Sequence, residues 1–434
     1  MISRERPNPM KPSRILRQRI FRTLLLGLGL SLVFAPAFGQ THLTFKAEQE
    51  RILLLAKWRV GPFRIQPILQ FRNVGYDNNV YSQNRDAGPV TDFTASAGIQ
   101  ANTYLFFRDW IIFSLVENPE YVFFFEQKTE RSLNNLFAPS LKMLLFDRLA
   151  LGGGYRYQKE RRRASSEFDV RANEMRSAVS GQIFYETERQ TALGLVGTIE
   201  RYRYEDISLP GEEFRFSLAL NRTEKNLSAQ VYYPVFSASR LFLNGRTTDY
   251  AFEFPEARWR DSTSSQVEAG IRFPEIGPVE GAFSLGYKKL SPKSPGKKSF
   301  SGLIGNTNIG VRVGRLAARA QYSRDSVFSF DDTNIYFVEN RWSLGASFYL
   351  GGFLRLDYDY SNGRASYPEP IPAGGGAGEI LRRDAYETHS FGFVVRIVRT
   401  TGIGLQANYW ERDSNIFAEQ VSRWFLGGFL TFEF

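Results

Sequence analysis

The sequence has 434 residues and contains no cysteine. This absence excludes disulfide bonds, cysteine metal sites and a lipid anchor on an N-terminal cysteine. Histidine is nearly absent as well, because only His42 and His389 occur, and a metal site built from histidines is therefore not expected. We predict neither a metal nor a cofactor for this chain.

Long hydrophobic runs are also missing. The longest, Thr23–Phe34, has about twelve residues, whereas a membrane-spanning helix needs about 20. The mean hydropathy of −0.31 agrees with this shortage. Together these two properties argue against a bundle of transmembrane helices.

The formal net charge of +10 is concentrated near the N-terminus. Residues 1–39 contain seven arginines and lysines and a single acid, Glu5, and so carry +6 of the total. The rest of the chain is close to neutral for its size, so nucleic-acid binding loses its main electrostatic support. No nucleic-acid partner is expected.

Residues 1–39 have the layout of a secretory signal peptide. Basic residues from Arg14 to Arg22 precede the apolar run, and small residues at Ala37 and Gly39 follow it. We predict cleavage at about Gly39/Gln40, with an uncleaved anchor helix as the alternative. Residues 40–61 are then expected to be a periplasmic lead-in. Within it Lys46–Lys57 forms a short helix, for which a plug of the barrel is the alternative role.

Aromatic residues are abundant, at 15% of the chain, and apolar and polar residues alternate along many segments. In Leu354–Tyr360, for example, the leucines and tyrosines share one parity while Arg355, Asp357 and Asp359 take the other. Period two predicts β-strands with one apolar and one polar face. A soluble β-sandwich and a membrane barrel both have such strands.

The lengths of the connections separate these two folds. Short turns such as Arg108-Asp109, Gly314-Arg315 and Gly351-Gly352 alternate with long polar stretches such as Tyr76–Val90, Lys159–Arg171 and Ser361–Arg383. Strict alternation puts all short turns at one end, as in outer-membrane barrels. We predict an all-β fold, a transmembrane antiparallel up-and-down barrel over residues 62–434. It has 18 strands if Ser217–Val235 is one strand, and 16 is the alternative.

The last segment, Ser422–Phe434, is a predicted strand that ends on an aromatic residue. Its apolar face includes Trp424, Leu430, Phe432 and Phe434. We expect this strand to close the barrel by pairing with Phe63–Val74, and its aromatic end to be the signal recognised by the barrel-assembly machinery. Deletion of Phe434 is expected to impair insertion.

Charged residues on the polar face of the strands are the candidate pore lining. They are Arg156, Arg312, Arg319, Arg355, Asp357 and Asp359. Rings of both signs are able to set a field across a pore or to pair and fill it. The basic run Lys159–Arg163 is predicted in an exposed loop, where it contacts phosphates of lipopolysaccharide or forms an anion-attracting vestibule.

Enzymatic activity is not predicted. Ser361-Asn362-Gly363 resembles the Ser-Asn-Gly of an outer-membrane phospholipase, but Asp359 stands where that enzyme has its histidine. His389 and Ser390 are adjacent, so on a regular strand they point to opposite faces. No catalytic residues are assigned, and a lipid-modifying enzyme ranks third among the functions considered.

The segment Lys57–Tyr81 ends in Gly75-Tyr76-Asp77-Asn78-Asn79-Val80-Tyr81. This motif is similar to the opening of the β-barrel porin 2 family of bacterial outer-membrane proteins. The family's barrel strands are also similar in style to the rest of residues 57–434. The resemblance implies a porin-like diffusion channel in a Gram-negative-type outer membrane, with saccharides or exopolysaccharide as cargo. A structural or secretion-associated barrel with a blocked lumen is the alternative.

The Asx residues of the motif also have a physical interpretation of their own. Asp77, Asn78 and Asn79 are able to bond their own backbone and fold the end of a strand into a loop. A Ca²⁺ site formed by Asp77 and Asn79 is the second interpretation. The expected partners of the protein are outer-membrane lipids, lipopolysaccharide, the assembly machinery and small solutes or glycans.

Overall fold

A computed structural model of the protein describes residues 45–434, except for 85–87, 190, 210–211, 237–238, 274–277, 373–377, 399, 417–419 and 434. The predicted signal peptide, the first part of the predicted lead-in and Phe434 lie outside the described residues. The chain divides into two units, residues 1–55 and 56–434. We describe them separately.

The described part of the first unit is the helix α1 (Phe45–Leu55), which confirms the short helix predicted within Lys46–Lys57. The helix carries an acid, Glu48, in its first turn, where it complements the positive end of the helix dipole. No helix among the described residues is long and apolar enough to cross a membrane.

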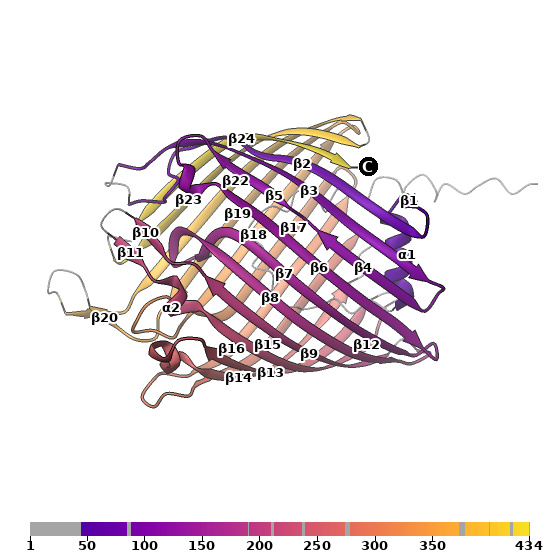
Figure 1. Ribbon diagram of the computed structural model, residues 1–434, viewed down its shortest axis with the longest axis horizontal. Coiled ribbons are helices and arrows are strands. Elements are labelled where there is room, and N and C mark those ends of the chain that lie inside the picture. The colour runs from indigo at the N-terminus through magenta and orange to yellow at the C-terminus, as the bar shows by residue number, and fades with distance from the viewer. Residues whose placement is uncertain are drawn as a thin grey trace, which may run out of the picture. The chain divides into compact units, whose positions relative to one another are not determined.

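The second unit is a closed antiparallel β-barrel (Figure 1). Each wall strand pairs with the next one in the chain, and the last pairs with the first. The wall strands are β2 (Phe63–Asp77), β3 (Asp92–Phe107), β4 (Ile111–Glu117) continued by β5 (Glu120–Phe124), β6 (Ser132–Leu145), β7 (Leu149–Ser165), β8 (Phe168–Glu186), β9 (Ala192–Tyr204), β12 (Arg222–Pro234), β13 (Arg240–Phe252), β14 (Ser262–Phe273), β15 (Val279–Pro292), β16 (Phe300–Val313), β17 (Leu316–Phe328), β18 (Tyr336–Leu350), β19 (Leu354–Ser366), β22 (Arg383–Val398), β23 (Thr401–Ser414) and β24 (Val421–Glu433).

The barrel has 18 wall strands, as predicted. β4 and β5 count as one interrupted strand, since both pair with β3 and with β6. The doubtful segment Ser217–Val235 contributes one strand, β12, because its first residues belong to the short helix α2 (Phe216–Leu220). The short strand β1 (Trp58–Val60) pairs with the start of β2 in an antiparallel hairpin and is not counted as a wall strand.

Short and long connections lie at opposite ends of the barrel, which we call the turn end and the loop end (Figure 1). The loop end carries α2, the 3₁₀ helices η4 (Lys128–Glu130) and η5 (Pro255–Arg260), and two small hairpins. These hairpins are β10 (Ile207–Leu209) with β11 (Glu212–Phe214), and β20 (Ile371–Pro372) with β21 (Glu379–Ile380). The prediction of a long loop at Lys159–Arg171 was wrong. β7 and β8 run through it as a paired ladder that ends in a tight turn at Ser166 and Glu167.

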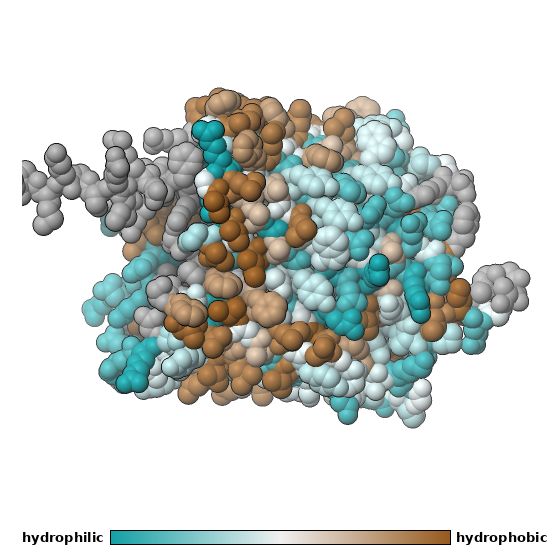
Figure 2. Space-filling model, turned by 180° about the vertical axis from the view of Figure 1, so that it is seen from behind, coloured by the Kyte–Doolittle hydropathy of each residue, from teal (hydrophilic) through white to brown (hydrophobic). Residues whose placement is uncertain are grey.

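Alternation along the strands gives the barrel an apolar outer face. On β9 the side chain of Ile199 is 55% exposed on the outside, whereas the next residue, Glu200, is fully buried on the inside. Hydrophobic side chains gather in a band across the wall, with polar ones on its loop side (Figure 2). A β-bulge at Asn73, whose φ is +51°, reverses the alternation on β2. Beyond it Gly75 and Asp77 share the inner face.

Candidate functional site

The six predicted pore-lining residues all lie on the inner face of the barrel, opposite the apolar parity of their strands. Arg355 forms an ion pair with Asp357 at 2.8 Å, and Arg319 forms one with Asp359 at 2.9 Å. The second pair reaches across the intervening strand β18, where Gly345 has no side chain to obstruct it. Arg312 stacks on Tyr349 and Arg156 donates to Gln158. Four of these six charges thus pair with one another, and the six do not form a ring of one sign.

The basic run Lys159–Arg163 lies in β7, and its arginines are engaged by other residues. Arg161 pairs with Glu130 at 2.6 Å, and Arg162 pairs with Glu174 at 2.6 Å. Arg163 lies over the ring of Trp410 and donates to Ser82. The arginines are therefore fixed by acids and aromatic rings, and their interpretation as a solvated loop was wrong.

A charged cluster that the alternation only partly indicated lines the inner face of β8, β9 and β12. Arg176 is bonded to Glu200, and Arg222 is bonded to Glu224 at 2.8 Å. The ring of Tyr202 lies between the two guanidinium groups, 4.9 and 4.2 Å from them. The polar parity of these strands was visible in the sequence, but the pairing depends on a register that it does not reveal.

The β7–β8 hairpin crosses the loop end of the lumen. β7 and β8 are early strands of the wall, yet Ser166 and Glu167 at the tip contact residues of the opposite side. Ser166 donates to Glu339 of β18 at 2.8 Å, and Arg412 of β23 donates to the Glu167 carbonyl at 2.8 Å. A hairpin that spans from one wall to the other narrows the passage through the barrel.

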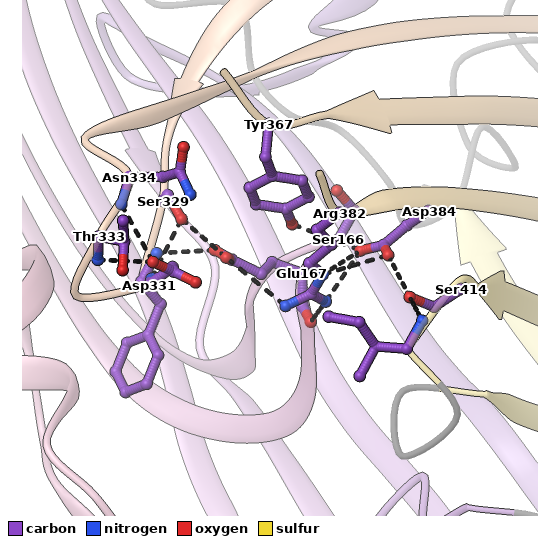
Figure 3. Close-up of polar contacts among 12 residues, drawn as sticks. Ser166, Glu167, Ser329, Asp331, Thr333, Asn334, Tyr367, Arg382, Asp384 and Ser414 are labelled. Atoms are coloured by element: carbon purple, nitrogen blue, oxygen red, sulfur yellow. Dashed lines mark hydrogen bonds and ion pairs between the residues drawn. The ribbon is translucent and has the colours of Figure 1, made fainter. Parts of the chain in front are cut away.

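Glu167 is the centre of this contact and is fully buried (Figure 3). Its carboxylate accepts hydrogen bonds from the Ser329 hydroxyl and the Phe330 amide, both at 2.7 Å. Arg382 lies 4.0 Å away and is itself held by Asp384. Burial raises the pKa of Glu167, and the charge of Arg382 opposes this rise. We call the tip Ser166–Glu167 and its contacts the latch.

Other loops also lean inward and support the latch. Arg260 of η5 is buried and donates to the carbonyls of Ser329 and Asp331. Phe216 of α2 stacks on Phe330 at 4.8 Å between ring centroids. Burial lowers the pKa of Arg260 to about 10. The loops that contain η5 and α2 and the β7–β8 hairpin thus all contact residues 329–331.

The sequence contained no signal for this convergence. Glu167 lies in a stretch of charged residues that is typical of a solvated loop. Its partners come from β17–β18, β22 and β23, more than 160 residues further along the chain. Only a closed barrel brings these segments to one mouth.

The Asx motif lies at the seam between β2 and β24. The Asp77 carboxylate pairs with Arg423 and accepts the Asn79 amide, and Asn78 exchanges hydrogen bonds with the backbone of Trp424. Asn79 bonds the backbone of Gln83 and Ser422. The side-chain oxygens of Asp77, Asn78 and Asn79 thus accept hydrogen bonds within the turn and across the seam. The geometry therefore favours their role in folding the strand end into a loop over a Ca²⁺ site. No group of three or more metal-ligating side chains occurs among the described residues.

The C-terminal strand pairs with the first wall strand, as predicted. Leu430 is the partner of Phe71, and Phe432 is the partner of Leu69. Trp424 is exposed on the outer face and stacks on Tyr76 of the motif, with 5.3 Å between centroids. The motif and the terminal strand therefore form one structural unit, which the sequence presented as two separate signals.

His389 and Ser390 lie on opposite faces of β22. His389 faces outward with Nδ1 3.0 Å from the Tyr358 hydroxyl, and Ser390 is the inward-facing partner of Asp359. Asp359 in turn is held by Arg319, so it is not oriented toward Ser361 as a base. The described residues around both serines thus lack the relay that nucleophilic catalysis needs.

A closed antiparallel barrel with an apolar outer wall and a charged inner wall is the architecture of outer-membrane β-barrels. No protein-family model and no curated protein matches the chain. The resemblance of residues 57–434 to the β-barrel porin 2 family therefore stays a prediction.

Solved structures of outer-membrane proteins are similar in fold. The outer-membrane protein opdK of Pseudomonas aeruginosa matches with a TM-score of 0.48 and 10% identity, over 85% of this chain and 98% of its own. A BenF-like porin of Pseudomonas fluorescens matches with 0.48 and 11%, over 86% and 99%. The siderophore receptor PirA of P. aeruginosa matches with 0.44 and 8%, over 87% and 81%. Such distant likeness carries no argument about cargo.

Proposed function

We propose that the protein is an outer-membrane channel whose loop end is closed by the β7–β8 hairpin in the observed conformation. The membrane location rests on the band of exposed hydrophobic side chains around the barrel, which would be costly in water. It rests also on the separation of short and long connections to opposite ends. Export would use residues 1–39 as the signal peptide, with the turn end in the periplasm.

The latch is the observation that carries the channel proposal. The wall consists of 18 strands, and a barrel of this size is wide enough to enclose an aqueous lumen. The segment that crosses this lumen is held by hydrogen bonds and ion pairs to Glu167 and Ser166, and not by strand pairing to the far wall. Polar contacts of this kind exchange with water, so the hairpin is suited to opening.

Planar-bilayer recording tests the proposal. Glu167→Ala removes the acceptor for Ser329 and Phe330 and should raise the open probability or the conductance of single channels several-fold. Glu188→Ala is the matched control, because Glu188 pairs with Arg148 at the turn end and is exposed. The control should behave like the wild type. A lack of any conductance in the wild type and in Glu167→Ala would contradict the channel.

The alternative is a structural or secretion-associated barrel whose lumen stays blocked. The observation in its favour is the number of loops that converge on residues 329–331, with Arg260 and Phe216 packed behind the hairpin. This barrel would remain non-conducting even when Glu167 and Arg260 are replaced together. The double variant therefore separates the two functions.

The proposal that the channel carries saccharides rests only on the resemblance of Gly75–Tyr81 to its family. Neutral sugars would pass the paired inner charges without strong attraction or repulsion. Current block by maltodextrins of increasing length, added to Glu167→Ala channels, tests this cargo. A current that maltodextrins of every length leave unchanged would contradict the saccharide cargo.

A further inference from the structure

Three basic residues stand on the outer face of the barrel where the apolar band ends. They are Arg201 of β9, Lys225 of β12 and Lys289 of β15, and all three are exposed. On each strand the outward position next to the base, toward the turn end, is hydrophobic and more than half exposed. These positions are Ile199, Leu227 and Tyr287. The bases therefore mark the edge of the band on the loop side.

Two acids in the same sector are already engaged by other bases. Asp249, the strand partner of Lys225, is held by Lys293 at 2.6 Å. Glu253 is held by Arg203 at 3.3 Å. Among the described residues Arg201, Lys225 and Lys289 have neither an ion pair nor a side-chain hydrogen bond. This sector, which we call the basic rim, thus presents an excess of positive charge directly above exposed apolar side chains.

The sector formed by β22 and β23 differs in sign. There the outward residues at the loop side include Glu387 and Glu411, which face each other in register. Tyr360 donates to Glu387, and Tyr409 donates to Glu411. This sector therefore presents two facing glutamates together with the exposed Arg383, in contrast to the three bases of the basic rim.

We propose that the basic rim binds the phosphate groups of anionic lipid headgroups in the leaflet at the loop end. A lipid that lies against Ile199, Leu227 and Tyr287 places its headgroup beside the three bases, and charge-assisted bonds to phosphate are strong. A free anion in solution would bind the bases without contacting the apolar side chains next to them. The inference rests on the proposed membrane location, but it does not depend on conductance.

Native mass spectrometry of the detergent-solubilised barrel with diphosphorylated lipid A tests the proposal. The triple variant Arg201→Gln, Lys225→Gln, Lys289→Gln should bind lipid A roughly a hundredfold more weakly, since each base near an anionic lipid contributes about fivefold. The matched control removes three exposed arginines from tight turns, as Arg108→Gln, Arg189→Gln, Arg315→Gln. It should bind like the wild type.

Equal binding by the rim variant and the wild type would overturn the proposal, and so would an equal loss in both triple variants. Inorganic phosphate is the second probe. If it displaces lipid A at equal phosphate concentration, the site recognises a free anion and the lipid assignment is wrong. A channel that fails to conduct but binds lipid A at the rim would refute only the proposed function.

Discussion

Asp77 in β2 and Arg423 in β24 form an ion pair across the seam at which the first and last wall strands meet. Asp77 is only 1% exposed, and the Arg423 guanidinium offsets the cost of burying its side chain. The residues that join the ends of the barrel are thus 346 positions apart in the chain. The contact links the closure of the sheet to a motif that is visible in the sequence.

Asp77→Asn should weaken the seam. The substitution removes the charge that Arg423 pairs with, and because the Arg423 side chain is 23% exposed the cost should be about 1.5–3 kcal/mol. We expect the folded band on a semi-native gel to convert to the unfolded one at a clearly lower temperature. Asp249→Asn is the control, because its pair with Lys293 is exposed and contributes about 1 kcal/mol or less. Equal shifts in the two variants would argue against a special role of the seam.

Gly75→Ala should impair barrel closure through steric conflict. A Cβ at this position would lie 2.1 Å from the Leu426 carbonyl oxygen, which belongs to the backbone of β24. Folding yield into detergent should drop severalfold, and β24 should become accessible to protease. Gly245→Ala is a suitable control, since nothing lies within 4 Å of the Cβ it would add. Normal assembly of Gly75→Ala would contradict the close approach.

Channel opening should depend on pH through Glu167. Burial in the closed state raises its pKa above that of an exposed carboxyl group. The stabilisation of the closed state is therefore fully present below the ordinary carboxyl pKa, and it is lost as pH rises through the raised value. The charged groups facing Glu167 are Arg382, Arg412 and Arg260, with Asp331 and Asp384 nearby.

Open probability should accordingly fall on acidification, and bilayer recordings over a pH series measure it. Glu167→Gln has no charge at this position and should flatten the profile. A profile that is unchanged in Glu167→Gln would assign the pH dependence to another group. If the wild type opened more at low pH, the expected direction of the effect would be wrong.

The Arg319–Asp359 pair should influence ion selectivity. Both side chains are about 42% exposed on the inner face, so ions that pass through the proposed channel would meet the pair. Asp359→Asn leaves Arg319 without its partner and should shift the reversal potential toward anions in a salt gradient. Arg319→Gln should shift it toward cations. Shifts of equal sign in the two variants would show that neither residue lies in the permeation path.

Much of the barrel could be predicted from the sequence because alternation and connection length are local properties. Leu354–Tyr360 shows its two faces in seven residues, and short turns such as Gly314-Arg315 are visible as such. The barrel of 18 strands and the pairing of the last strand with the first followed from these patterns. The placement of Arg319, Arg355 and Asp359 on the inner face followed from parity alone.

The latch and the basic rim were decided by the tertiary structure alone. Glu167 stands in a charged stretch that resembles a solvated loop, and it is buried only because the closed wall brings Ser329, Arg382 and Arg412 to the same mouth. Likewise Arg161 and Arg162 are paired with Glu130 and Glu174, whereas Arg201, Lys225 and Lys289 have no such partners among the residues that the structure describes. Strand alternation fixes the face on which a side chain lies, whereas its charge partners depend on register and on loops that fold across the lumen.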